Sequence, residues 1–241
     1  MTRLCFLSCG LLVGAIAFAA EEPHAPASQT VARYTATTAN VSGAPDNIRI
    51  DILRWSTDAE REKLMDAWDL KVAPTGRGAA AAGRGAAARG GAARGGAGRG
   101  GGRGGASEST PRPTPEGELA IALKATTTVG YLWSSEVAGY AIRYAGRIAN
   151  ADGSERIVLI TQRRLGAVND LWKPAGAETL PYDFSLIELH LKSNGEGEGK
   201  ASLIGKIAPD TAFKFIALQN YDSLPIVLTN VKRARSHDAA K

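Results

Sequence analysis

Apolar and polar positions alternate most clearly over residues 48–52, where three isoleucines alternate with Arg49 and Asp51. A period of two residues is typical of a strand with one buried face. A weaker alternation over residues 31–38 predicts an earlier strand. The run GAPDN at residues 43–47 is rich in residues that favour turns, so we expect a turn between the two strands.

The period then changes to that of a helix. Thr57-Asp58-Ala59-Glu60 is a capping box, in which the Thr57 hydroxyl and the Glu60 carboxylate each accept a hydrogen bond from a backbone N–H. An apolar face follows, formed by Leu64, Met65 and Trp68. The sequence therefore predicts a helix that begins after Thr57 and ends before Pro74.

A second helix is predicted to begin after Thr114. Thr114 is a favourable N-cap, Pro115 suits the first helical position, and the acidic Glu116 and Glu118 complement the helix dipole. The inward face of this helix would consist of Leu119, Ala122, Leu123 and Thr126.

Strand-like alternation returns over residues 140–148. Asp152-Gly153 is a hairpin signal, and we expect a two-residue turn there. That turn predicts the pairs Ile148 with Ile157, Gly146 with Leu159, Tyr144 with Thr161 and, on the other face, Arg143 with Gln162. Two more hairpins are expected, one pairing residues 184–192 with 200–208 through 193–199, and one pairing 213–218 with 225–231 through 219–222.

These elements predict a β-rich α+β fold. About eight strands would form an antiparallel meander, curled into a barrel or an open sandwich, with a two-helix insertion between strands 2 and 3. The predicted domain spans residues 31–232, and a Gly/Ala/Arg-rich loop at 74–113 interrupts it. We expect the leader at 21–30 and the tail at 233–241 to be disordered.

The first 20 residues resemble a secretory signal, with Arg3 before an apolar run from Leu4 to Phe18. We expect cleavage near Ala19 or Ala20, no transmembrane segment in the mature chain, and a secreted or periplasmic location. Both cysteines, Cys5 and Cys9, lie in this segment. Cleavage would leave no thiol for a disulfide, a nucleophile or a cysteine-bound metal.

The charge balance depends on the Gly-Ala-Arg tract at residues 76–105. The chain has 29 Lys and Arg against 24 Asp and Glu, and removing Arg3 with the six arginines of the tract leaves 22 against 24. The tract is either a tolerated loop expansion or an arm that binds polyanions, such as an anionic component of the cell envelope. It lacks aromatic residues for base stacking, so we expect no specific nucleic-acid ligand. Its candidate residues are Arg77, Arg84, Arg89, Arg94, Arg99 and Arg103.

Histidine is scarce in the predicted domain, where His190 shares a strand face with Glu188 and Lys192. We interpret His190 as a surface neighbour of Glu188, with a general base as the alternative. No residue is assigned a catalytic role, and we expect no metal and no cofactor. A hydrolase or isomerase that uses carboxylates, for example Asp183 with Glu188 or Asp51, stays open as the alternative to a non-catalytic protein.

Aromatic and cationic residues lie near the predicted ends of elements. Such residues could form a pocket for a small anionic or carbohydrate ligand through arginine contacts and ring stacking. Alternatively, the tryptophans fill the edge of the core and the arginines pair with acids. The candidate ligand-binding residues are Arg54, Trp55, Tyr131, Trp133, Arg163, Arg164 and Trp172.

Several segments together resemble an uncharacterised family of exported bacterial proteins. They are residues 54–57 (RWST), 129–133 (VGYLW), 162–166 (QRRLG), 186–189 (LIEL) and 197–203 (GEGKASL). The resemblance covers roughly residues 45–232 without the tract. It implies export and a single domain, but it implies no activity and no substrate. The sequence thus favours an exported, non-catalytic binding or envelope-associated protein of unknown ligand.

Overall fold

The structure is a computed structural model of the chain. It describes residues 30–43, 47–71, 112–134, 137–167, 172–175 and 178–234. The predicted signal at 1–20, the arginine tract at 76–105 and nearly all of the predicted leader and tail lie outside the described residues.

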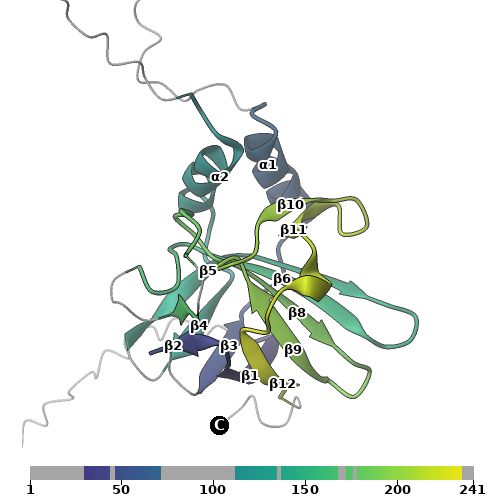
Figure 1. The fold of residues 1–241 in the computed structure, drawn as a ribbon. Coiled ribbons are helices and arrows are strands. Elements are labelled where there is room, and N and C mark those ends of the chain that lie inside the picture. Colours follow the sequence, from purple (N-terminus) through teal and green to yellow (C-terminus); the bar gives the residue numbers. More distant parts are fainter. Residues whose placement is uncertain are drawn as a thin grey trace, which may run out of the picture.

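Eight strands form a closed antiparallel barrel in which neighbours along the chain pair with each other (Figure 1). The last strand closes the barrel against the first. The strands are β1 (Ala32–Thr38), β3 (Ile48–Ile52), β4 (Gly130–Ser134), β5 (Val137–Ala149), β6 (Glu155–Thr161), β8 (Leu186–Leu191), β9 (Glu196–Ala201) and β12 (Leu228–Arg233). This confirms the predicted fold class, as a barrel rather than a sandwich.

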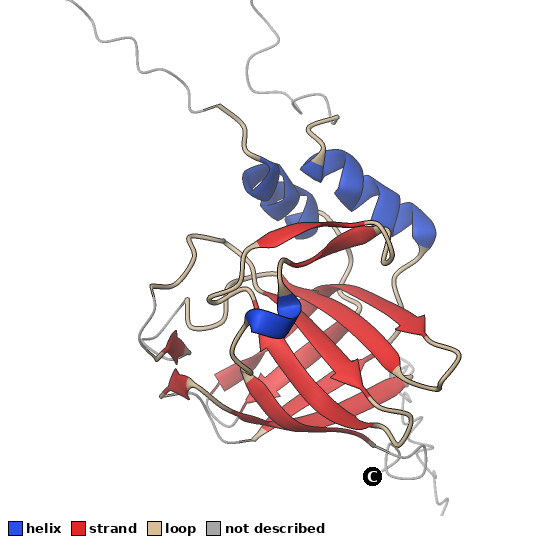
Figure 2. Cartoon of the chain, turned by 45° about the vertical axis from the view of Figure 1, so that its right-hand side comes forward, coloured by secondary structure: helices blue, strands red, loops and turns tan. Residues whose placement is uncertain are grey.

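The two helices lie side by side against one side of the barrel (Figure 2). They are α1 (Asp58–Trp68) and α2 (Pro115–Lys124), inserted between the second and third barrel strands as predicted. Both predicted caps are present, because the hydroxyls of Thr57 and Thr114 each accept a bond from a backbone N–H at 3.2 Å. Within the described residues, no helix combines the length and the apolar character needed to cross a membrane.

Four shorter strands and a 3-10 turn lie outside the barrel ladder. The hairpin of β10 (Ile207–Asp210) and β11 (Phe215–Leu218) lies between the helices and the barrel (Figure 2), and η1 (Tyr221–Ser223) follows it. A separate two-stranded pair joins β2 (Val41–Ser42) to β7 (Lys173–Pro174).

Two apolar clusters form among the described residues, one on each side of the barrel wall. Inside the barrel, Ile50, Leu132, Ile142, Leu159 and Leu189 have no exposed surface. Side chains fill the interior of an eight-stranded barrel when they are large, as these are. The second cluster lies between the outer face of the barrel and the covering helices and hairpin, and it includes Leu64, Leu123, Tyr144, Val158, Ile160, Leu186 and Phe215.

The predicted register between β5 and β6 is wrong by one residue. Ile148 lies opposite Arg156, not Ile157, because the connection is a three-residue loop rather than a two-residue turn. Gly153 donates its N–H to the Asn150 carbonyl at 3.0 Å and has a φ of +80°, which glycine adopts without strain. The slip moves the partners of Gly146 and Tyr144 to Val158 and Ile160. The contact between Arg143 and Gln162 forms nevertheless, with 3.1 Å between Nε and Oε1.

The other two predicted hairpins are also wrong in their pairing. The glycine-rich run predicted as a loop contains β9, which pairs with β8 from Gly197 opposite Leu191 to Ala201 opposite Ile187. A Cβ on Gly197 would lie 1.9 Å from the His190 carbonyl oxygen, so this glycine permits close strand pairing.

The last strands pair differently as well. β11 pairs with β10, whereas β12 pairs with β9 and β1. β12 reaches Arg233, one residue beyond the predicted domain boundary, and the N–H of Ala234 bonds to the Arg33 carbonyl at 2.8 Å.

Candidate functional site

The seven predicted ligand-binding residues lie in three separate places. Arg54 and Trp55 follow the end of β3, at the end of the barrel where β5 and β12 also finish. Tyr131 and Trp133 lie on the outer face of β4, with 5.4 Å between their ring centroids, and the guanidinium of Arg49 lies 5.5 Å from the Trp133 ring. Trp55 lines a pocket whose walls include neither Tyr131 nor Trp133.

The remaining three follow β6 near the opposite end of the barrel. Arg163 lies over the Tyr140 ring at 4.6 Å, and Arg164 donates to the Thr179 hydroxyl at 2.9 Å. Trp172 is 1% exposed and belongs to the interior cluster, so it fills the core. Ligand binding by any of the seven residues stays a prediction.

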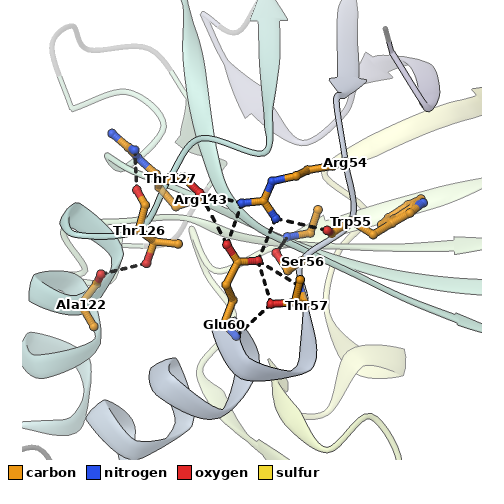
Figure 3. A network of polar contacts seen from close by, with 10 residues as sticks. Arg54, Trp55, Ser56, Thr57, Glu60, Ala122, Thr126, Thr127 and Arg143 are labelled. Atoms are coloured by element: carbon orange, nitrogen blue, oxygen red, sulfur yellow. Dashed lines mark hydrogen bonds and ion pairs between the residues drawn. The ribbon is translucent and has the colours of Figure 1, made fainter. Parts of the chain in front are cut away.

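Arg54 fixes the start of α1 (Figure 3). Its guanidinium donates to both carboxylate oxygens of Glu60, at 2.6 and 2.8 Å, and to the Thr127 hydroxyl at 2.6 Å. The hydrogen bond from Arg54 is the main reason that the pKa of Glu60 falls to about 2. Glu60 also accepts the N–H of Thr57 at 2.9 Å. The helix start is thereby tied to the segment that precedes β4.

Ser56, which lies between Arg54 and the helix, completes the edge of β5. β4 pairs with β5 only as far as Gly130 opposite Ile142. Beyond that point Ser56 donates its N–H to the Ala145 carbonyl at 2.8 Å, and its hydroxyl accepts the Ala145 N–H at 3.0 Å. Backbone groups of alternate residues face the same side of an antiparallel strand. The N–H of Arg147 therefore faces this open edge, away from β6.

A pocket of about 300 Å³ lies at this open edge, beside the first turn of α1. We call it the α1 pocket. Its walls include Trp55, Ser56, Arg61, Tyr144, Arg147 and Phe213. A helix N-terminus carries partial positive charge from its unsatisfied N–H groups, which favours an anion nearby.

Tyr144 supplies an unpartnered donor to the α1 pocket. Its side chain is buried, with 3% of the residue exposed, and its ring stacks on Phe215 with 4.0 Å between centroids. The ring lies along β5 so closely that a Cβ on Gly146 would be 2.5 Å from the hydroxyl oxygen. Within the described residues the hydroxyl has no hydrogen-bond partner. Burial raises the pKa of Tyr144, so the hydroxyl keeps its proton and can donate it.

The charges around the pocket do not cancel. Arg147 and Arg233 both bind Glu155, which leaves this cluster with one positive charge in excess. Arg61 binds Asp58 at 2.6 Å, and Asp58 is the only acidic side chain among the described residues that line the pocket. The Arg147 guanidinium also lies 5.9 Å from the Trp55 ring. The pocket thus combines net positive charge with an aromatic wall.

The sequence pointed to only part of this pocket. Trp55 was among the candidates and the capping box marked the helix start, but Arg61, Tyr144 and Arg147 were missed. An irregularity in β5 between Ile142 and Tyr144 reverses the predicted alternation, so Tyr144 lies on the outer face beneath α1 rather than on the same face as Ile142. No motif marks a single tyrosine whose partner is missing.

Comparison with protein-family models, with curated proteins and with solved structures gives no match. Among the described residues, no group of three or more His, Cys, Asp or Glu side chains could hold a metal ion. The geometry of the pockets is therefore the basis for a functional proposal.

Proposed function

We propose that the protein is an exported, non-catalytic binding protein whose α1 pocket holds a small carboxylate. The observation that carries this proposal is the hydroxyl of Tyr144, which lines the α1 pocket beside a helix N-terminus and has no hydrogen-bond partner within the described residues. A hydrogen bond to a charged group contributes about 1.5–3 kcal/mol. A carboxylate at this position would gain that contribution from the Tyr144 hydroxyl.

The pocket offers several donors to one anionic group. One oxygen of a carboxylate can accept a hydrogen bond from the Tyr144 hydroxyl. The other oxygen can accept a hydrogen bond from the guanidinium or the backbone N–H of Arg147. The positive end of the α1 dipole also favours a negatively charged group in the pocket. Because Asp58 is held by Arg61, its repulsion of a ligand is partly compensated.

The remaining walls are apolar. Trp55, Ile148 and Phe213 line the pocket together with the charged residues. A volume of about 300 Å³ suits a small molecule rather than a chain. The geometry therefore supports an acid with a short apolar or aromatic body, and benzoate is a suitable probe.

Export rests on the sequence. Arg3, the apolar run from Leu4 to Phe18 and the small residues at 17–20 support a cleaved signal. A protein exported in this way would meet its ligand outside the cytoplasm.

The proposal is tested by titrating the protein lacking residues 1–20 with benzoate in a calorimeter. We expect binding, and we expect Tyr144→Phe to weaken it roughly 10- to 100-fold, the range for losing one hydrogen bond to a charged group. The fold should survive, because the ring still stacks on Phe215. Tyr182→Phe is the matched control, since Tyr182 stacks on Phe184 outside the pocket. Equal affinity in Tyr144→Phe and the unmodified protein, or no heat with millimolar benzoate, would overturn the proposal.

A further inference from the structure

A second hollow, of about 620 Å³, lies on the outer face of β6, β8, β9 and β12. These four strands are neighbours in the barrel (Figure 1). We call it the His190 cleft. Its walls include Arg156, His190, Lys192, Glu196, Glu198 and Lys232. It shares no lining residue with the α1 pocket.

A fully buried carboxylate lies behind the cleft. Glu188 has no exposed surface and accepts hydrogen bonds from Arg156 Nε at 2.6 Å, from His190 Nε2 at 2.8 Å and from the Leu218 N–H at 3.0 Å. Burial alone would raise the pKa of Glu188, but the hydrogen bonds from His190, Arg156 and Leu218 outweigh it and lower the pKa. Glu188 is therefore ionised and can only accept hydrogen bonds.

This carboxylate fixes the tautomer of His190. Because Glu188 can only accept, the hydrogen of the neutral imidazole has to be on Nε2, which leaves a lone pair on Nδ1. The His190 ring stacks on the Tyr221 ring, with 3.7 Å between the ring centroids and 8° between the ring planes. Within the described residues Nδ1 has no hydrogen-bond partner, and 39% of the side chain is exposed. The cleft thus contains an oriented, unused acceptor.

Around this acceptor the charges are balanced. Lys232 binds Glu196 at 3.1 Å, and Arg156 binds both Glu188 and Asp210. Among the residues that line the cleft, the three carboxylates of Glu155, Glu196 and Glu198 balance the three cations Arg156, Lys192 and Lys232. Asn150, Ser154 and Asn230 also line the cleft and carry amide and hydroxyl groups. The lining thus contains both donors and acceptors without excess charge, in contrast to the α1 pocket.

We propose that the His190 cleft binds a neutral carbohydrate. Each sugar hydroxyl both donates and accepts a hydrogen bond, so a surface with interspersed donors and acceptors complements it, whereas a simple ion would meet opposing charges. His190 Nδ1 accepts a bond from one hydroxyl, Glu198 accepts from another, and Lys192 donates to a third. The volume accommodates about two sugar rings.

The test uses saturation-transfer NMR and calorimetry with maltose, cellobiose and trehalose on the protein lacking residues 1–20. At least one of these disaccharides is expected to bind. His190→Gln should weaken that binding at least tenfold, because a glutamine amide can still donate to Glu188 but places no acceptor at the position of Nδ1. Tyr221→Phe is the matched control, since it keeps the stacked ring and removes a hydroxyl that is buried without a partner in the described structure.

A second variant covers the possibility that His190→Gln unfolds. Glu198→Gln changes a side chain that is 40% exposed, so the fold should be kept while sugar binding falls several-fold. Absence of binding by all three disaccharides at 10 mM, roughly the weak limit for a specific sugar site, would overturn the proposal. Undiminished binding in both cleft variants would overturn it as well. Neither result bears on the α1 pocket, whose probe and variants are separate.

Discussion

The inside of the barrel and the layer on its outer side are built in different ways. Inside, the middle of the barrel is filled by apolar side chains such as Ile50 and Leu159, which have no exposed surface. In the outer layer, buried apolar groups surround polar ones, including the carboxylate of Glu188 and the hydroxyl of Tyr221, and the Tyr144 hydroxyl lines the α1 pocket. Both candidate sites, the α1 pocket and the His190 cleft, lie on the outer side of the barrel.

The two regions also depend on different parts of the chain. The barrel interior is formed by strands that pair with their sequence neighbours. In the outer layer Glu188 relies on the N–H of Leu218, and Arg156 relies on Asp210, both from the β10–β11 hairpin. Mutations should thus act on the interior through lost packing and on the outer layer through unpaired charge.

The largest effect is expected for Glu188→Ala. It leaves Arg156, His190 and the Leu218 N–H without their shared acceptor. Breaking a buried pair costs about 3–5 kcal/mol, and we expect a loss of unfolding free energy near the lower end because Asp210 still binds Arg156. Urea unfolding measures this loss. A change below about 1 kcal/mol would show that the buried network is not needed for stability.

Leu159→Ala tests the interior. It should cost about 2–5 kcal/mol through lost burial and the cavity left behind. Affinity for benzoate and for disaccharides should stay unchanged, because Leu159 lines neither pocket. The same urea experiment, combined with calorimetry, measures both quantities. Loss of ligand binding in a folded Leu159→Ala protein would contradict the division between interior packing and outer binding.

Glu60→Gln is expected to have a smaller, pH-dependent effect. The pKa of Glu60 lies at about 2 in the folded protein against an ordinary 4.5, so the ionised carboxylate stabilises the fold above pH 4.5. That stabilisation is lost as the pH falls from 4.5 towards 2. At pH 6 the variant should be less stable by about 1 kcal/mol, given the partial exposure of the pair. Thermal melts at pH 6, 5, 4 and 3 should show this gap narrowing, and a constant gap would contradict the assignment.

Deletion of residues 76–105 should have the smallest effect, and in the opposite direction. The connection over residues 72–111 would become roughly four times shorter, and each halving of a flexible loop saves about 0.6 kcal/mol of closure entropy. We therefore expect a gain of at most about 1 kcal/mol. Destabilisation on deletion would show that the tract contacts the domain. Loss of heparin binding at low salt would support the polyanion-binding role.

Local sequence signals predicted the helices and strands of this fold better than they predicted which strands pair with each other. The capping box at Thr57 and the cap at Thr114 identified both helices, since each signal involves neighbouring residues. Gly197 was predicted to lie in a loop, but it lies in β9. Its role in close strand pairing depends on the opposite strand, which the local sequence does not identify. The burial of Glu188 was not predictable either. It depends on a hairpin about 30 residues later in the chain.

The same limit applies to the candidate sites, where the sequence indicated only the features that neighbouring residues determine. Trp55 was found because aromatic and cationic residues at an element end can be recognised in the sequence. Tyr144 was assigned only to a strand, since its missing hydrogen-bond partner is a property of the packed outer layer. For His190, the neighbouring Glu188 was recognised, but not that this carboxylate is fully buried and fixes the imidazole tautomer.

The central claim, that ligands bind outside a filled barrel, is tested most directly by mapping benzoate onto the backbone amides of the 15N-labelled protein by NMR. We predict concentration-dependent shifts for Ser56, Arg61 and Arg147, with the amides of Leu159 and Leu189 unchanged. Shifts centred on the interior strand residues instead, with Ser56 and Arg147 unaffected, would contradict it.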